Sequence, residues 1–159
     1  MNFTFTKEQL MIQQMAKEFA EKYLEPVAEQ VDRENKIPDE ILKGLAELDL
    51  FGIPYAEEYG GAGGGYDGYV LAMEQISRAC SGVAMTISAH SLSLSAINVF
   101  GTEEQKKKYI PKLASGEWKG AYGLTEPNSG SDALGAKTTA VLSEDGKHYI
   151  LNGQKCWIT

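Results

Sequence analysis

The sequence predicts an α+β protein, in which an N-terminal all-α helical bundle domain is followed by the start of an antiparallel β-domain. Three observations support this fold class. Apolar residues recur at helical spacing up to about residue 117, and beyond it they alternate with a period of two. The pair Asn152-Gly153 then separates two apolar runs, which is the strongest short signal for a β-hairpin. We therefore expect a helical domain over residues 1–117 and the beginning of a β-domain, with its strands incomplete, over residues 118–159.

Composition and charge exclude several classes of function. The chain has 159 residues and is 43% hydrophobic, which is enough to bury a core. Fifteen basic and 22 acidic residues give a formal net charge of −7, and the basic residues form no broad stripe. Lys106–Lys108 follow Glu103 and Glu104 on one predicted helix, an order that suits the helix dipole and a solvated face. We expect no nucleic-acid partner.

Cysteine usage and the N-terminus favour a cytoplasmic protein without a metal site. Cys80 and Cys156 lie far apart and show no CxxC spacing, and His90 and His148 do not cluster with them. The N-terminus lacks a basic segment followed by an apolar one, and we find no apolar run of transmembrane length. We therefore expect no membrane partner.

The first helix is predicted from a start signal and an apolar stripe. Thr6 and Gln9 have the spacing of a capping box. The stripe that follows, at steps of four, consists of Met11, Met15, Phe19 and Tyr23. Such a stripe is more often core than a cofactor contact. The helix should kink or restart at Pro26 and continue to about residue 35.

Four further helical segments follow in the first 117 residues. The first begins at Pro38 and should bury Ile41, Leu42, Leu45 and Leu48. The second and third are expected over residues 69–79 and 81–100, and the fourth begins at the capping box at Thr102 and ends at Gly116. The segment 81–100 carries no charged side chain and is apolar on almost every side. That pattern predicts a helix buried in the middle of the bundle, which could equally line a pocket for an apolar ligand.

The glycine-rich segment 60–68 formally contains G-x-G-x-x-G at Gly63, Gly65 and Gly68. A dinucleotide fingerprint needs a preceding strand and an acidic residue about 20 positions later, and both are missing. We interpret this segment as a flexible loop before a helix.

The last forty residues have the pattern of strands. Segments 118–124, 138–143, 148–151 and 155–158 are the candidates, with a hairpin turn expected at Asn152-Gly153. Three or four strands with an open edge make a poor independent domain. We therefore interpret the chain as the N-terminal piece of a longer protein.

The stretch from Tyr122 to Asp132 lies where helices give way to strands. Pro127 favours an extended Glu126, and Gly130 could supply a positive φ angle in the turn that follows. The hydroxyl of Ser131 and the neighbouring N–H groups could form a concave anion site. Local chemistry alone favours an ordinary solvated loop between two domains.

Two motifs in this part of the chain resemble signatures of the acyl-CoA dehydrogenase family of flavoproteins. Residues 125–132, Thr-Glu-Pro-Asn-Ser-Gly-Ser-Asp, resemble the family's Thr-Glu-Pro-x-Ala-Gly-Ser-Asp, with Ser129 where Ala is commonest. Residues 152–159, Asn-Gly-Gln-Lys-Cys-Trp-Ile-Thr, resemble its Asn-Gly-x-Lys-x-Trp-Ile-Thr. Residues 58–63 resemble a family loop, so that the similarity covers the whole chain, and short- or branched-chain (butyryl-CoA-type) members are the most similar.

The resemblance implies an architecture and a cofactor. The family has an N-terminal helical domain, a middle β-domain and a C-terminal four-helix domain, so that the chain would lack the last of these. FAD would bind between the β-domain and the helical domains. The residues expected to contact it are Tyr122, Leu124, Thr125, Gly130, Ser131, Trp157, Ile158 and Thr159. Among them, Ser131 would also contact the acyl-CoA substrate.

The reaction implied by the resemblance is α,β-desaturation of an acyl-CoA, with electrons passed to an electron-transferring flavoprotein. A glutamate outside these residues would take the α-proton, and the β-hydrogen would leave as hydride to the flavin. No acid in this sequence matches that glutamate, so we expect no catalytic residue here and little activity or FAD affinity from the piece alone. The family is usually tetrameric, which implies a homotetramer for the full-length protein.

Two alternatives stay open from the sequence. One is a flavin acyl-CoA oxidase of the same fold, which would differ in oxygen access. The other, from a different class, is a non-catalytic module that binds a CoA ester or serves in assembly without flavin. Both signature motifs are free of disabling substitutions, which favours the dehydrogenase.

Overall fold

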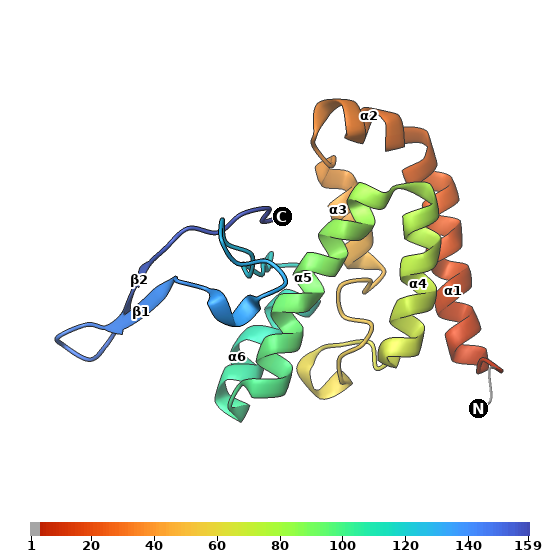
Figure 1. Cartoon of the computed structure of the whole chain (residues 1–159). Coiled ribbons are helices and arrows are strands. Elements are labelled where there is room, and N and C mark those ends of the chain that lie inside the picture. The colour runs from red at the N-terminus through yellow and green to blue at the C-terminus, as the bar shows by residue number, and fades with distance from the viewer. Residues whose placement is uncertain (1–3) are drawn as a thin grey trace. The chain divides into compact units, whose positions relative to one another are not determined.

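The computed structural model describes residues 4–159 and divides the chain into two units, with the first ending at Gly120 and the second beginning at Ala121. Figure 1 shows the elements of each unit. The first unit contains the helices α1 (Lys7–Phe19), α2 (Ala28–Glu34), α3 (Asp39–Glu47), α4 (Gly65–Ala79), α5 (Ser81–Phe100) and α6 (Glu103–Ala114). The second unit contains the strands β1 (Thr139–Leu142) and β2 (Tyr149–Asn152). Helices followed by an antiparallel pair confirm the predicted α+β class.

Both predicted capping boxes are present. The Thr6 side chain accepts from the Gln9 N–H while the Gln9 side chain accepts from the Thr6 N–H, and Thr102 and Gln105 repeat the arrangement at α6. The predicted break at Pro26 is also confirmed. A π-helical turn (Ala20–Leu24) and a 3₁₀ turn (Glu25–Val27) separate α1 from α2, because proline cannot donate the hydrogen bond that an α-helix needs.

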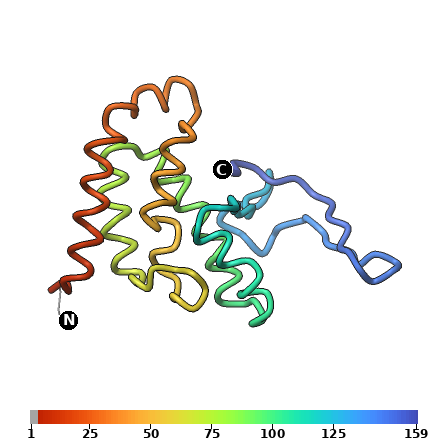
Figure 2. Tube along the Cα trace, turned by 180° about the vertical axis from the view of Figure 1, so that it is seen from behind, coloured from red at the N-terminus to blue at the C-terminus, as the bar shows by residue number. Residues whose placement is uncertain are grey.

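The core of the first unit lies between α1, α4, α5 and the segments that follow α2. Helix α1 packs on α4, α4 on α5 and α5 on α6, and α1 and α4 lie side by side in Figures 1 and 2. Fully buried side chains include Leu24, Leu45, Ile76, Ile87 and Leu94. Each supplies roughly 1.5–3 kcal/mol of hydrophobic stabilisation relative to an exposed position.

Helix α5 is confirmed as a helix, but the expectation that it is buried on every side is wrong within the described residues. Met85, Leu92 and Val99 are exposed at 59%, 51% and 63%, and they recur every seven residues along one face. The opposite face is buried against α4 and α6. This helix is also long and apolar enough to cross a membrane by length and composition, contrary to our sequence estimate, although core helices pass the same test.

The second unit corrects three predictions about strands. Strands β1 and β2 pair antiparallel with Thr139 opposite Asn152 and Leu142 opposite Tyr149. The predicted segments 138–143 and 148–151 are thus confirmed as strands, joined by a turn at residues 143–148, whereas the hairpin expected at Asn152-Gly153 does not form in the described chain. The turn at residues 143–148 is fixed by Asp145, whose carboxylate accepts from the Ser143 hydroxyl and the Lys147 N–H. Segments 118–124 and 155–158, both within the described chain, are extended or irregular and form no strand.

Candidate functional site

The two signature segments lie against each other within the second unit. The Cys156 N–H donates to the Thr125 carbonyl oxygen at 2.8 Å, and the Lys155 ammonium donates to the Leu124 carbonyl oxygen at 3.0 Å. The contact between the two segments extends to Gly123 and Ile158, because a Cβ placed on Gly123 would lie 3.7 Å from the Ile158 side chain. Residues about 30 positions apart in sequence thus form one continuous surface.

The first signature segment contains a tight turn. Glu126 and Ser129 exchange two backbone hydrogen bonds of 2.9 and 3.1 Å, and the buried Ser129 hydroxyl donates to the Asp132 carbonyl oxygen at 2.6 Å. The hydroxyl that distinguishes Ser129 from the commoner alanine therefore stabilises the turn. The expected positive φ angle at Gly130 is wrong, because this turn closes without one.

The Glu126 carboxylate is the buried centre of the arrangement. The residue is only 7% exposed, and its two oxygens accept from the Lys137 N–H at 2.6 Å, the Thr138 N–H at 3.1 Å and the Lys155 ammonium at 2.8 Å. The Lys155 ammonium above all, together with the other donors, lowers the pKa of Glu126 to about 2. Sequence reasoning assigned this residue only to the turn. The available signal in the sequence was that the first motif contains an acid, Glu126, and the second a lysine, Lys155, which could pair.

Several residues predicted to contact a cofactor are exposed on the second unit. Tyr122, Leu124 and Ile158 are each more than 40% exposed and Trp157 is 92% exposed. The Trp157 backbone has a φ angle of 59°, a left-handed conformation that costs a bulky residue of order 1–3 kcal/mol. Such strain is concentrated at ligand-binding positions in proteins, and an exposed indole there offers a flat apolar surface.

Polar groups near these side chains are available as donors. Within residues 4–159, the N–H groups of Thr125, Gly130 and Ser131 have no intramolecular partner, and neither do the hydroxyls of Thr125, Ser131 and Thr159. A Cβ on Gly130 would meet no atom within 4 Å, so a ligand could approach this backbone closely. The set suits a ligand that has both a planar ring and acceptor oxygens.

Family models match both units. The model for the acyl-CoA dehydrogenase N-terminal domain matches residues 6–117, and the model for the acyl-CoA dehydrogenase middle domain matches residues 121–159. The chain belongs to the acyl-CoA dehydrogenase family. The resemblance that the two signature motifs indicated is thereby confirmed.

Individual acyl-CoA dehydrogenases and related structures match over nearly the whole chain. The short-chain-specific acyl-CoA dehydrogenase of Clostridium acetobutylicum is 47% identical over 160 residues, covering 100% of this chain and 42% of that protein. An acyl-CoA dehydrogenase of Bacillus anthracis complexed with FAD aligns with a TM-score of 0.89 and 46% identity, over 97% of this chain and 27% of that one. A chain from the structure of the electron transferring flavoprotein of Acidaminococcus fermentans aligns with a TM-score of 0.92 and 44% identity, over 99% of this chain and 41% of that one.

The chain therefore spans less than half the length of these relatives. The family match places both acyl-CoA dehydrogenase signatures in the segment after Gly120, and the individual contacts predicted for Tyr122, Leu124, Thr125, Gly130, Ser131, Trp157, Ile158 and Thr159 stay predictions.

A buried histidine joins two segments of the helical unit, as expected for a polar group on the apolar segment 81–100. His90 on α5 is 4% exposed, and its Nδ1 accepts from the Gly120 N–H at 3.0 Å. Nε2 must then carry the proton, and it donates to the Leu113 carbonyl oxygen at 3.0 Å. Burial lowers the pKa of His90 despite the opposing effect of the Leu113 carbonyl. The neutral ring thus ties α5 to the segment that leads out of the helical unit.

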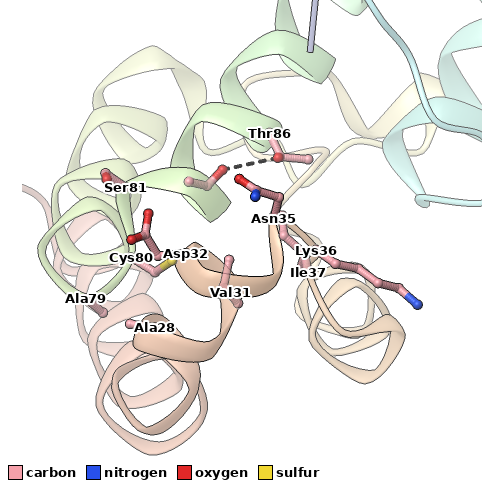
Figure 3. Close-up of a pocket in the computed structure, with 11 residues that line it drawn as sticks. Ala28, Val31, Asp32, Asn35, Lys36, Ile37, Ala79, Cys80, Ser81 and Thr86 are labelled. Atoms are coloured by element: carbon pink, nitrogen blue, oxygen red, sulfur yellow. Dashed lines mark hydrogen bonds between the residues drawn. The ribbon is translucent and has the colours of Figure 1, made fainter.

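The helical unit also has a hollow of about 430 Å³ beside the end of α2 and the start of α5. Figure 3 shows Asp32, Asn35 and Ser81 among the side chains around it, with the Thr86 hydroxyl bonded to the Gly82 carbonyl oxygen at 3.1 Å. None of the predicted site residues lines this hollow, and we do not assign it to the same site.

Proposed function

We propose that the whole protein carrying this chain is an FAD-dependent acyl-CoA dehydrogenase that desaturates a short acyl-CoA between its α- and β-carbons. One observation supports this most directly. The two family signatures are joined backbone to backbone at Thr125 and Cys156, so the residues expected to hold flavin come from one continuous surface. A non-catalytic module would not need both motifs brought together in this way.

FAD fits the groups available on that surface. The exposed Tyr122, Leu124 and Trp157 would border the isoalloxazine ring, together with Ile158. The free hydroxyls of Thr125 and Thr159 would bind its polar edge. Gly130 and Ser131 would face the pyrophosphate, where open space beside Gly130 allows close approach. When bound, the flavin supplies the acceptor for the hydride that leaves the substrate β-carbon.

The role of this chain is placement and electrostatics, with no proton transfer of its own. A base must lie within hydrogen-bonding reach of the substrate α-carbon in its ionised form. Glu126 is a poor candidate, because its carboxylate is buried and occupied by three donors. We place the base outside these residues, and we assign Ser131 to the acyl-CoA as well as to the cofactor.

Substrate and partner are proposed from the relatives and from the sequence of α5. The C. acetobutylicum relative is described as short-chain specific, and serines intersperse the apolar residues of α5, a composition that we interpret as favouring a short or branched acyl group. We propose an electron-transferring flavoprotein as acceptor, consistent with the A. fermentans match. We further propose a cytoplasmic homotetramer.

The visible spectrum of the whole protein tests the proposal. We expect a flavin absorption band that bleaches when butyryl-CoA is added anaerobically. Recovery of the band with an electron-transferring flavoprotein, but only slowly with oxygen, identifies a dehydrogenase. Rapid recovery with oxygen and stoichiometric hydrogen peroxide would identify an oxidase instead. A colourless protein that still binds butyryl-CoA would contradict both enzymatic functions.

A further inference from the structure

We infer that Glu126 and Lys155 form a charge-paired clamp whose role is to position the flavin-contacting end of the chain, residues 157–159. The inference rests on the proposed FAD site and goes beyond it, because neither residue is among those expected to contact the cofactor. Both are positioning residues, since they act through the backbone that they hold.

The first step of the argument is the geometry of Lys155. Its ammonium reaches Glu126 at 2.8 Å and the Leu124 carbonyl oxygen at 3.0 Å. The side chain thus bonds the charged centre of the first signature and the backbone directly before that signature. The Lys155 side chain is 30% exposed and that of Glu126 is 6% exposed, so the pair is screened less than a surface ion pair.

The second step is what the carboxylate holds on its other side. Glu126 accepts from the consecutive N–H groups of Lys137 and Thr138, directly before β1. One carboxylate therefore joins the turn, the entry to the hairpin and the second signature. Removing the lysine leaves the buried Glu126 carboxylate with part of its bonding capacity unfilled, which costs more than losing a surface pair.

The third step connects the clamp to the strained residue. Lys155 and Cys156, both fixed to the first signature, immediately precede Trp157 with its φ angle of 59°. A bulky residue leaves the left-handed region when its neighbours are free to relax. The clamp therefore over-determines the backbone before Trp157, the first of the three residues at this end that are expected to contact FAD.

The experiment compares FAD binding by the whole protein and by its Glu126→Gln, Lys155→Met, Lys155→Arg and double Glu126→Gln/Lys155→Met variants. Glu144→Gln and Lys147→Met are matched controls, because they make the same chemical changes at exposed positions of the hairpin. We expect Glu126→Gln and Lys155→Met each to weaken FAD binding by about tenfold to 100-fold, as loss of supporting residues does at other cofactor sites. Lys155→Arg, which keeps a cationic donor to the carboxylate, should bind FAD within about threefold of wild type.

The double variant separates a clamp from two independent effects. If the residues act as a pair, the double variant loses no more FAD affinity than the single variant that binds FAD less tightly, within the error of a double-mutant cycle. Losses that multiply would overturn the pairing. At saturating FAD, the flavin absorption maximum and midpoint potential should shift in the clamp variants. Unchanged values at saturation would show a role in folding alone and would overturn the positioning role.

A flavin-independent measurement keeps this inference separate from the proposed function. Hydrogen–deuterium exchange of the Cys156 amide, in the whole protein without FAD, should accelerate at least about tenfold in Glu126→Gln if the clamp holds this segment. The exchange of α4 and α5 should stay unchanged, which controls for unfolding. Exchange of the Cys156 amide equal to wild type would overturn the clamp even if FAD binds. A wild-type protein that binds no FAD, with this acceleration present, would contradict the proposed function alone.

Discussion

The Gly120 N–H donates to His90 Nδ1, and this bond joins the middle of α5 to the last residue of the helical unit. The opposite ring nitrogen bonds the Leu113 carbonyl oxygen near the end of α6. The Gly120 bond requires the neutral ring with its proton on Nε2, because a protonated Nδ1 cannot accept, and the Nε2 proton is the one donated to Leu113. The imidazole also packs on the Phe51 ring at 4.9 Å between centroids. The histidine therefore fixes the exit of the chain from the helical unit.

The helical unit should lose stability as the pH falls below about 6.5, and His90 should be responsible for part of the loss. The pKa of His90 is lowered in the folded state, so below 6.5 the unfolded chain binds the proton more readily than the folded one. The contribution is present above 6.5 and is lost as the pH falls toward the lowered pKa. Urea unfolding at several pH values measures the slope.

His90→Gln is the matched variant, since it keeps polar groups without a titration near neutral pH. We expect it to cost about 1–3 kcal/mol at pH 8, because the two backbone bonds are remade imperfectly. Its stability should vary less than that of wild type between pH 7 and pH 5. Parallel slopes for the two proteins would show that another group carries the dependence.

Tyr55→Phe should destabilise the helical unit through one buried hydroxyl. Tyr55 is 1% exposed, and its hydroxyl donates to the Ser91 carbonyl oxygen at 2.7 Å and lies 3.1 Å from the hydroxyls of Ser91 and Ser95. The ring itself would stay packed, so the loss should be about 1–2 kcal/mol, the range for a buried hydrogen bond. Denaturant unfolding measures it. Tyr149→Phe, at an exposed position of β2, is the control and should change stability by less than about 0.5 kcal/mol.

Acid should weaken the clamp of the second unit only at low pH. The folded pKa of Glu126 is about 2, set first by the Lys155 ammonium, against an ordinary value of 4.5. Its stabilising contribution is thus fully present above pH 4.5 and is lost as the pH falls toward 2. Carbon NMR of the Glu126 carboxyl should show a midpoint near 2 in wild type. In Lys155→Met the midpoint should rise, and an unchanged midpoint would contradict the assigned cause.

The helices could be predicted from the sequence because their signals are local. The capping boxes at Thr6 and Thr102 and the interruption at Pro26 each depend on residues within one or two turns. The strand segments 138–143 and 148–151 were predicted in the same way and match β1 and β2, but the hairpin turn was expected at Asn152-Gly153. Asn152-Gly153 is a strong local signal, but the turn at 143–148 forms instead, stabilised by the Asp145 carboxylate, and it sets the register of β1 and β2.

The site was predictable as a pair of motifs but not as a structure. The motifs identify residues 125–132 and 152–159, whereas the bond between Cys156 and Thr125 depends on about 30 intervening residues. The burial of Glu126 likewise arises only when Lys137 and Lys155 approach it. A tertiary ion pair of this kind leaves no periodic pattern in the sequence. The exposure of one side of α5 was missed for a similar reason, because composition does not show which face of a helix packs against its neighbouring helices.

Alanine substitution at two glycines should distinguish a cofactor position from a packing position. A Cβ on Gly130 would meet nothing within 4 Å in the chain itself, so Gly130→Ala should leave the free energy of unfolding unchanged within about 0.5 kcal/mol. If the FAD pyrophosphate lies against this backbone, the same variant should weaken FAD binding by about tenfold or more, because the methyl group prevents close approach. Gly61→Ala should behave oppositely, since its Cβ would collide with the Tyr55 carbonyl oxygen, and it should destabilise the helical unit. Thermal unfolding with and without FAD measures both variants, and wild-type FAD affinity in Gly130→Ala would remove Gly130 from the cofactor site.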